Sequence, residues 1–221
     1  MQISRVLQNV NNNLDENIDN AVSLLLSCDA WRRNVNGNYR PISVKHKADI
    51  IAISFFKMFL SWEEFLEESF LRLLVEAKSG TKGVRSLLDV KTKKEAFKIV
   101  KGDSKAYIDW ADVKKVRARA VLFFKDGKPY EQYLAAGSLH LDRMRKIRNR
   151  IAHRSQRAEK EFKDLVRELF GAYHHETPGS LLFRVPPVHF GLPPGASSGS
   201  TIVQSYASIL KVLASQIASC K

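Results

Sequence analysis

The sequence predicts an all-α protein, a helical bundle with one long helix and a Pro/Gly-rich segment before the C-terminal helix. Two observations favour this fold class. Apolar residues recur every three or four positions through most of the chain, which places them on one face of a helix. No internal repeat and no run of strand-like alternation interrupts that pattern. We expect a single domain over residues 1–221, which is long enough to bury a core.

The first half of the chain predicts two helices. Residues 3–31 carry apolar side chains on one helix face, from Val6 to Leu25. The segment "NVNGNYRP" at 34–41 has the composition of a loop. From Val44 to about Lys78 the pattern predicts one helix of ~35 residues, which would span ~50 Å and end at "KSGTKG".

The middle of the chain predicts shorter helices. "TKKEAFKIV" and "WADVKKVRARAVLFF" have helical patterns, and "KDGKP" is typical of a turn. Ser138 is a suitable N-cap for the helix that follows it. Ser155 is expected to cap the next helix, and Gly171 is expected to end it. The apolar face of that helix comprises Phe162, Leu165, Val166 and Leu169.

The last part of the chain changes in composition. Residues 176–200 are rich in Pro, Gly and Ser, which predicts an irregular arm or linker. Residues 201–219 then have the pattern of an amphipathic C-terminal helix.

The charge of the chain indicates a polyanionic partner. The formal net charge is +13, with the basic excess in 78–128 and 143–157, and nucleic acid is the partner that such a balance favours. The N-terminus lacks the pattern of a signal peptide, and charged residues interrupt the longest apolar cluster. We therefore expect a cytoplasmic protein without a membrane partner. A buried free thiol at Cys28 would fit that reducing compartment.

Other patterns do not predict a cofactor or a metal site. Cys28 and Cys220 lack the spacing of a disulfide framework or a zinc site. His174 and His175 are neighbours whose side chains would point about 100° apart on a helix, so exposed polar residues are the expected interpretation. The tryptophans Trp31, Trp62 and Trp110 are expected in the core or at an interface.

The segment "RMRKIRNRIAHRSQR", residues 143–157, contains the candidate catalytic and phosphate-binding residues. Two interpretations are open: a solvated basic helix end, or a site that holds a phosphodiester and cuts it. One histidine, His153, lies among seven basic residues: Arg143, Arg145, Lys146, Arg148, Arg150, Arg154 and Arg157.

Three side chains of the segment 143–157 suit RNA cleavage without a metal. Arg148 supplies a planar, permanently charged fork for a phosphate. His153 can exchange a proton with a ribose hydroxyl or a leaving oxygen, and Asn149 can orient either group. On a continuous helix Arg148 and His153 would be rotated by about 140°, so they converge only if the helix breaks or if each reaches a common cleft.

The motif "RNRIAH" resembles the R-x-x-x-x-H motif of HEPN domains, including the polar residue after the arginine. The surrounding layout is similar to the RiboL-PSP type of HEPN domain. A long helix "SWEEFLEESFLRLL" precedes the basic helix "LDRMRKIRNRIAH". An amphipathic helix, a "TPG" segment and a terminal helix follow. The resemblance covers most of the chain.

That resemblance implies a metal-independent endoribonuclease of a toxin–antitoxin or phage-defence system. It would act on RNA as a homodimer, with an antitoxin or another defence-system protein as a possible partner. Arg148 would bind the phosphate, His153 would act as acid and base, and Asn149 would orient them. Glu67 is the favoured acidic residue among Glu63, Glu64, Glu67 and Glu68. The RNA-binding residues would be Arg143, Arg145, Lys146, Arg150, Arg154 and Arg157.

An alternative function stays open at this point. Some HEPN domains keep the motif and bind RNA or scaffold complexes without cutting. In such a non-catalytic RNA-binding or protein-interaction module, affinity would depend on the total basic charge. Catalysis would instead depend on one imidazole.

Overall fold

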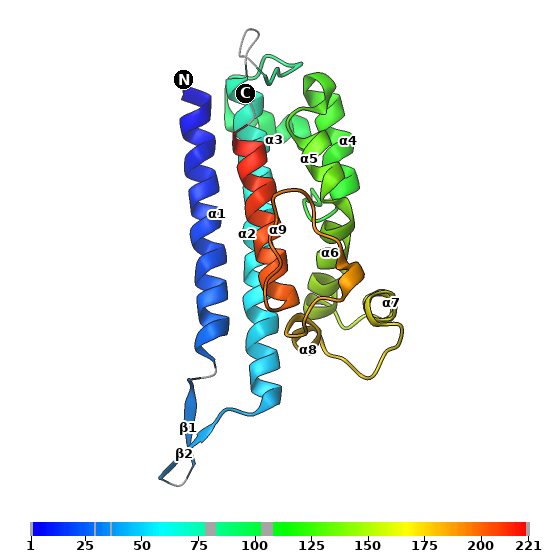
Figure 1. The fold of residues 1–221 in the computed structure, drawn as a ribbon. Helices are drawn as coiled ribbons and strands as arrows, with labels where there is room; N and C mark the ends of the chain where they lie inside the picture. The colour runs from blue at the N-terminus through cyan, green and yellow to red at the C-terminus, as the bar shows by residue number, and fades with distance from the viewer. Residues whose placement is uncertain (1, 29, 36, 78–82, 103–107, 220–221) are drawn as a thin grey trace. The chain divides into compact units, whose positions relative to one another are not determined.

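The chain is all-α in a computed structural model that describes residues 2–28, 30–35, 37–77, 83–102 and 108–219 (Figure 1). The side chains of residues 2–6 and 32–35 lie outside that description. The expected fold class is confirmed. In the described part of the chain, no helix combines the length and the apolar character needed to cross a membrane.

Residue contacts divide the chain into two compact units, which we describe separately. The first unit contains Met1–Asp15, Ser61–Asp142 and Leu210–Lys221. The second unit contains Glu16–Leu60 and Arg143–Ile209, and therefore holds the whole of the basic segment 143–157. The expectation of one domain stays a prediction.

The long N-terminal helices occur as expected, but the loop between them is a hairpin. Helix α1 is Gln2–Ser27 and α2 is Val44–Glu76. Between them, β1 (Arg32–Val35) pairs antiparallel with β2 (Asn38–Pro41). The prediction of a loop at 34–41 was wrong for the residues that form the two strands; an Asn-Gly pair between short strands is the typical sequence signal of a hairpin. Gly37 has a φ of 81°, which glycine adopts without a steric penalty.

The first unit has an aromatic core around Phe70. Its ring centroid lies 4.9 Å from that of Phe124, 5.1 Å from Tyr130 and 5.4 Å from Trp110. The buried hydroxyl of Tyr130 donates a hydrogen bond to Ser69 Oγ over 3.0 Å, and burial raises the pKa of this phenol. The expected core position of Trp110 is confirmed, and Trp62 is buried equally well.

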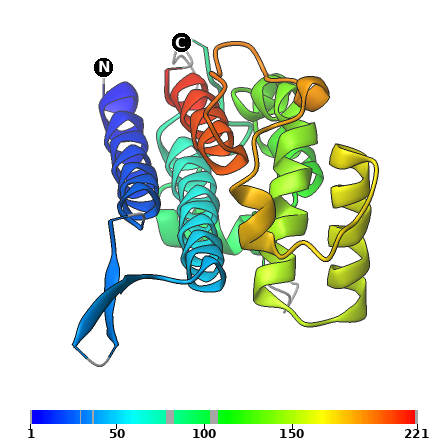
Figure 2. The same cartoon turned by 60° about the horizontal axis from the view of Figure 1, so that its bottom comes forward.

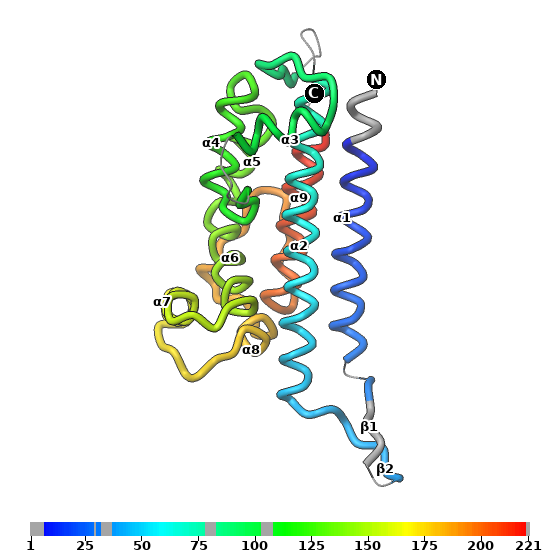
Figure 3. The backbone as a smooth tube through the Cα atoms, turned by 180° about the vertical axis from the view of Figure 1, so that it is seen from behind, coloured from blue at the N-terminus to red at the C-terminus, as the bar shows by residue number. Residues whose placement is uncertain are grey.

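Short helices complete the first unit. Helix α3 (Lys93–Lys101) begins after Thr92, and α4 (Val113–Phe123) begins after Asp112, each cap accepting a backbone N–H. A 3₁₀ turn, η1 (Lys125–Gly127), leads to α5 (Tyr130–Ala136), which the sequence did not predict. Figure 3 shows α4 and α5 side by side, where Arg117 Nε donates to Glu131 Oε2 over 3.1 Å. The helix expected from 110 starts later because Asp112 is its cap. The expected stop "KSGTKG" falls mostly on residues 78–82, outside the described residues.

The second unit contains the helices around the basic segment. Helix α6 is Ser138–Ala152, and its residues from Arg143 onward belong to this unit. Helix α7 is Gln156–Phe170, and it lies beside the end of α6 (Figure 2). The Ser155 cap is confirmed by its hydrogen bond from Ala158 N, and the Gly171 stop by a φ of 77°. Ser138, expected as a cap, is instead the first helical residue of α6.

The Pro/Gly-rich segment contains two short elements before the final helix. Helix α8 is Pro178–Leu182 and the 3₁₀ turn η2 is Val188–Phe190. The final helix α9 (Ile202–Ala218) matches the expected C-terminal helix. Helix α8 lies directly against the backbone of α2, because a Cβ added at Gly179 would be 1.8 Å from the Ala48 carbonyl oxygen.

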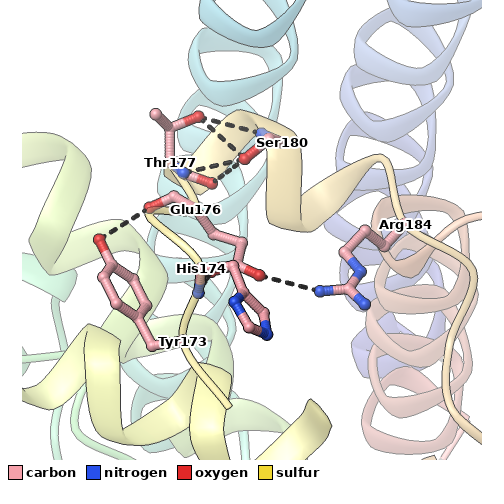
Figure 4. A network of polar contacts seen from close by, with 6 residues as sticks. All are labelled: Tyr173, His174, Glu176, Thr177, Ser180 and Arg184. Carbon is pink, nitrogen blue, oxygen red and sulfur yellow. Dashed lines mark hydrogen bonds and ion pairs between the residues drawn. The ribbon is translucent and has the colours of Figure 1, made fainter.

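A network of polar contacts fixes the connection from α7 to α8 (Figure 4). The Glu176 carboxylate accepts from the His174 backbone N–H over 2.7 Å and from Arg184 Nη1 over 3.0 Å. The backbone carbonyl oxygen of Glu176 accepts a hydrogen bond from the Tyr173 hydroxyl over 3.3 Å. Thr177 and Ser180 form a capping box at the start of α8. His174 and His175 are exposed, as the sequence predicts.

Candidate functional site

His153 lies where the basic helix ends. Helix α6 stops at Ala152, but the His153 N–H still donates to the Asn149 carbonyl over 2.9 Å, so its backbone completes the last turn. The chain then runs to Ser155, the cap of α7. The expected break after His153 is confirmed. The imidazole is exposed, and among the described residues it makes no hydrogen bond or ion pair.

Arg148 is held between an amide and an aromatic ring. Its Nη1 donates to Asn149 Oδ1 over 3.3 Å. Its guanidinium carbon lies 5.7 Å from the ring centroid of Phe56, on the part of α2 that belongs to the same unit. A guanidinium over an aromatic face is favoured electrostatically. These two contacts restrict the position of the guanidinium, and the orienting role of Asn149 in catalysis stays a prediction.

Arg148 and His153 point in different directions from one helix. Because α6 is continuous from Arg148 to Ala152, the two positions keep the rotation of about 140° expected for five residues. The sequence left two ways for Arg148 and His153 to converge, a helix break between them or a common cleft. The helix break does not occur. Convergence of the two side chains would therefore require each to reach a common cleft from its own edge of the helix, and this stays a prediction.

Arg143 is not a surface cation, and we leave it out of the RNA-binding set. Its side chain is buried, with Nε donating to Glu168 Oε1 over 2.9 Å and Nη1 to the Phe190 carbonyl over 3.0 Å. The reason lies in the helical repeat: residue 143 is one turn before Ile147, which is fully buried. A wheel of α6 would have shown this, whereas a count of charges could not.

The other basic residues are more accessible. Arg145, Lys146 and Arg150 are half-buried on α6, while Arg154 and Arg157 are exposed. Arg157 Nε donates to Glu161 Oε1 one turn along α7, over 2.8 Å. A hydrogen bond from Lys163, together with the charge of Arg150, lowers the pKa of Glu159.

The glutamates of α2 differ from one another in their surroundings. Glu63 is buried, Glu64 is exposed, and Glu67 is half-buried. Glu68 forms ion pairs with Arg72 and Lys93. All four belong to the first unit, whereas "RNRIAH" belongs to the second. The assignment of Glu67 to the site stays a prediction.

Phe56 is the residue near the motif that sequence reasoning missed. It lies in an apolar run of α2, where nothing distinguishes it from core residues. Its contact with Arg148 joins segments far apart in the chain, so no local pattern could show it. Among the described residues, no group of three or more His, Cys, Asp or Glu side chains could hold a metal ion.

Compared with protein-family models, with curated proteins and with solved structures, the chain matches none of them. The resemblance to HEPN domains therefore rests on the quoted residues, chiefly Arg148, Asn149 and His153.

Proposed function

We propose that the chain is a metal-independent endoribonuclease of the HEPN type, acting in a toxin–antitoxin or phage-defence system in the cytoplasm. The observation that carries this proposal is the arrangement at the end of α6. There an exposed histidine follows an arginine that Asn149 and Phe56 hold in place. Arg145 lies before the motif and Arg154 after it, and both can add attraction for the RNA backbone.

The proposed reaction is an internal transfer at phosphorus. The ribose 2′-oxygen forms a bond to phosphorus while the bond to the 5′-oxygen breaks, giving a 2′,3′-cyclic phosphate and a 5′-hydroxyl. A base accepts the 2′-hydroxyl proton, and an acid donates a proton to the leaving oxygen. Arg148 stabilises the charge that develops on the non-bridging oxygens, and its fork can bond two of them.

A homodimer would supply what one motif cannot. One histidine cannot be base and acid at the same moment, and Arg148 and His153 leave α6 about 140° apart. A two-fold pair of motifs brings two arginines and two histidines to one cleft, so that the groups of one copy complement those of the other. An antitoxin or another defence protein could then regulate the site by covering it.

The direct test is cleavage of total RNA by the purified chain in the presence of EDTA. We expect discrete RNA fragments that end in a 2′,3′-cyclic phosphate and begin with a 5′-hydroxyl. Protection of the fragments from 3′-end ligation before, but not after, the cyclic phosphate is opened and the resulting phosphate is removed to leave a 3′-hydroxyl identifies the ends. An intact RNA population under all buffer conditions would contradict the nuclease and leave the binding module as the function.

The binding module has one observation in its favour. The corner between α6 and α7 presents the exposed charge of Arg154 beside Arg157, which pairs with Glu161, and exposed arginines of this kind can contact phosphate without chemistry. Such a protein would bind RNA with a steep salt dependence and would not require His153.

Arg148 is expected to differ from its basic neighbours. Arg148→Ala should lower kcat by ~10²–10³, as for other donors aimed at a transition state, with little change in RNA affinity. Arg148→Lys should also be impaired, because an ammonium lacks the bidentate fork. The matched control is Arg154→Lys, which is exposed on the same segment and should retain turnover within about two-fold. Initial rates at saturating RNA provide the comparison, and equal losses at both positions would reduce the motif to a basic patch.

A further inference from the structure

A second basic site lies in the first unit, outside the segment 143–157. A pocket of about 260 Å³ is formed where the chain after α2 meets the turn after α4. Three basic side chains line it, all exposed at its rim: Arg85, Lys125 and Lys128. The remaining lining residues are Gly83, Val84 and Asp126.

Backbone hydrogen bonds hold these residues in place. Lys125 N donates to the Arg85 carbonyl over 2.9 Å, beside the antiparallel bridge between Ser86 and Phe124. The Lys128 N–H donates to the Lys125 carbonyl over 3.2 Å, which closes the turn. The three basic residues are thus attached to one hydrogen-bonded frame.

The turn is also anchored in the core. Asp126 has a φ of 58°, and Gly127 follows with a φ of 66°. A Cβ at Gly127 would come within 2.8 Å of Glu131 Cβ, so the turn packs closely against α5. Tyr130, which follows the turn, is fully buried. A frame of this kind can position charges without further ordering when a ligand arrives.

Within the described part of the chain, the charged side chains of the pocket are left without partners. Among the described residues, the side chains of Arg85, Lys125, Lys128 and Asp126 make no hydrogen bond or ion pair. Elsewhere in this unit, Arg117 bonds Glu131 and Lys115 bonds Asp109. Three cations and one carboxylate around a single hollow leave two positive charges, and their mutual repulsion is relieved when an anion enters.

We propose that this pocket binds a phosphate group. Its volume suits a phosphate or diphosphate but is below the usual range for a pocket that buries a drug-sized ligand. A group that binds here would therefore keep the rest of its molecule outside. A phosphate within a nucleic-acid chain satisfies that condition, because the chain can continue in both directions over the rim.

RNA is the source of phosphate that the charge of this unit favours. Further exposed lysines, Lys94, Lys98 and Lys114, lie on α3 and α4 and add long-range attraction for a polyanion. This assignment to RNA rests on the proposed function. The phosphate chemistry of the pocket does not, since a free phosphate compound would be recognised by the same three cations.

The test compares two triple variants that remove the same charge from the same unit. The pocket variant is Arg85→Gln/Lys125→Gln/Lys128→Gln, and the control is Lys94→Gln/Lys98→Gln/Lys114→Gln. Both are made as the full chain in a His153→Ala background, so that RNA remains intact during binding. The probes are a single-stranded RNA oligonucleotide with a 5′-hydroxyl and inorganic pyrophosphate. If the pocket triple does not fold, as judged by circular dichroism, Lys125→Gln against Lys114→Gln replaces the pair.

We expect the pocket variant to bind the oligonucleotide about 10-fold more weakly than its parent at ~0.1 M salt. Its salt slope should fall by ~0.7 for each phosphate that the variant no longer neutralises, whereas the control should change affinity by no more than about three-fold. Pyrophosphate should bind the parent and the control, but not the pocket variant. Loss of pyrophosphate binding with unchanged RNA binding overturns RNA as the source and keeps the phosphate site.

Equal effects of the two triples on both probes would overturn the proposal, because the pocket would then act only through net charge. Failure of pyrophosphate to bind the parent, together with equal RNA affinities, would do the same. If the wild-type chain never cuts RNA while the pocket variant shows the expected loss of binding, the nuclease is refuted and the pocket stands. The two proposals therefore fail through different measurements.

Discussion

Replacement of His153 by alanine is expected to lower the rate of RNA cleavage by ~10²–10⁴ and to leave RNA affinity almost unchanged. That range is the typical contribution of a positioned acid or base. The imidazole is exposed and makes no hydrogen bond or ion pair among the described residues, so its removal should disturb neither α6 nor the start of α7. Single-turnover cleavage and equilibrium RNA binding, measured on the same preparations, separate the two effects.

The matched control is His189→Ala. His189 is also exposed, lies in the same unit, and forms part of η2 rather than the motif. Its replacement should leave cleavage within about two-fold of the wild-type rate, since surface substitutions away from special features are usually small in effect. Cleavage by His153→Ala at the rate of His189→Ala would show that the imidazole has no catalytic role.

Gly179→Ala is expected to destabilise the second unit by ~3 kcal/mol, at the upper end for overpacking a closed contact. The new Cβ would lie 1.8 Å from the Ala48 carbonyl oxygen and 2.5 Å from its carbon. Both atoms belong to the backbone of α2, so no side-chain rotation can relieve the clash. Helix α8 would have to move, and Leu181 and Leu182, which are fully buried, would lose their packing.

Gly171→Ala is the control that separates the cost of a steric clash from the cost of a left-handed backbone conformation. Gly171 has a φ of 77°, but nothing lies within 4 Å of the added Cβ. A left-handed residue of this kind costs about 1–2 kcal/mol when it carries a side chain. Urea denaturation of both variants should give a lower midpoint for Gly179→Ala than for Gly171→Ala. The reverse order would mean that α8 does not pack on α2 as described.

The elements that could be predicted are those whose signals are local. The Ser155 cap and the Gly171 stop of α7 act within one turn of the helix, and its apolar face follows directly from the repeat. The long helix from Val44 was predicted for the same reason. The hairpin was missed because four-residue strands are too short to show alternation, although the sequence contains the Asn-Gly pair that is typical of hairpins.

The residues of the candidate site could be predicted from the sequence, but their tertiary contacts could not. Arg148, Asn149 and His153 are neighbours in sequence, so a motif could identify them. The burial of Arg143 follows from the helical repeat of α6, but its contacts with Glu168 and Phe190 depend on tertiary packing. The contact of Arg148 with Phe56 depends on the packing of α6 against α2 within one unit. Both are tertiary facts, and composition carries no information about them.

The hairpin between α1 and α2 has a consequence for self-association. A described sheet of only two strands leaves one edge of each strand without a neighbouring strand, and such edges can recruit another chain. All four residues of β2 are exposed, but the strand ends at Pro41, which has no N–H, and carries the charge of Arg40. Short length, proline and charge are the features by which natural proteins prevent edge-to-edge aggregation. The proposed homodimer is therefore expected to form through helices rather than by extending a shared sheet.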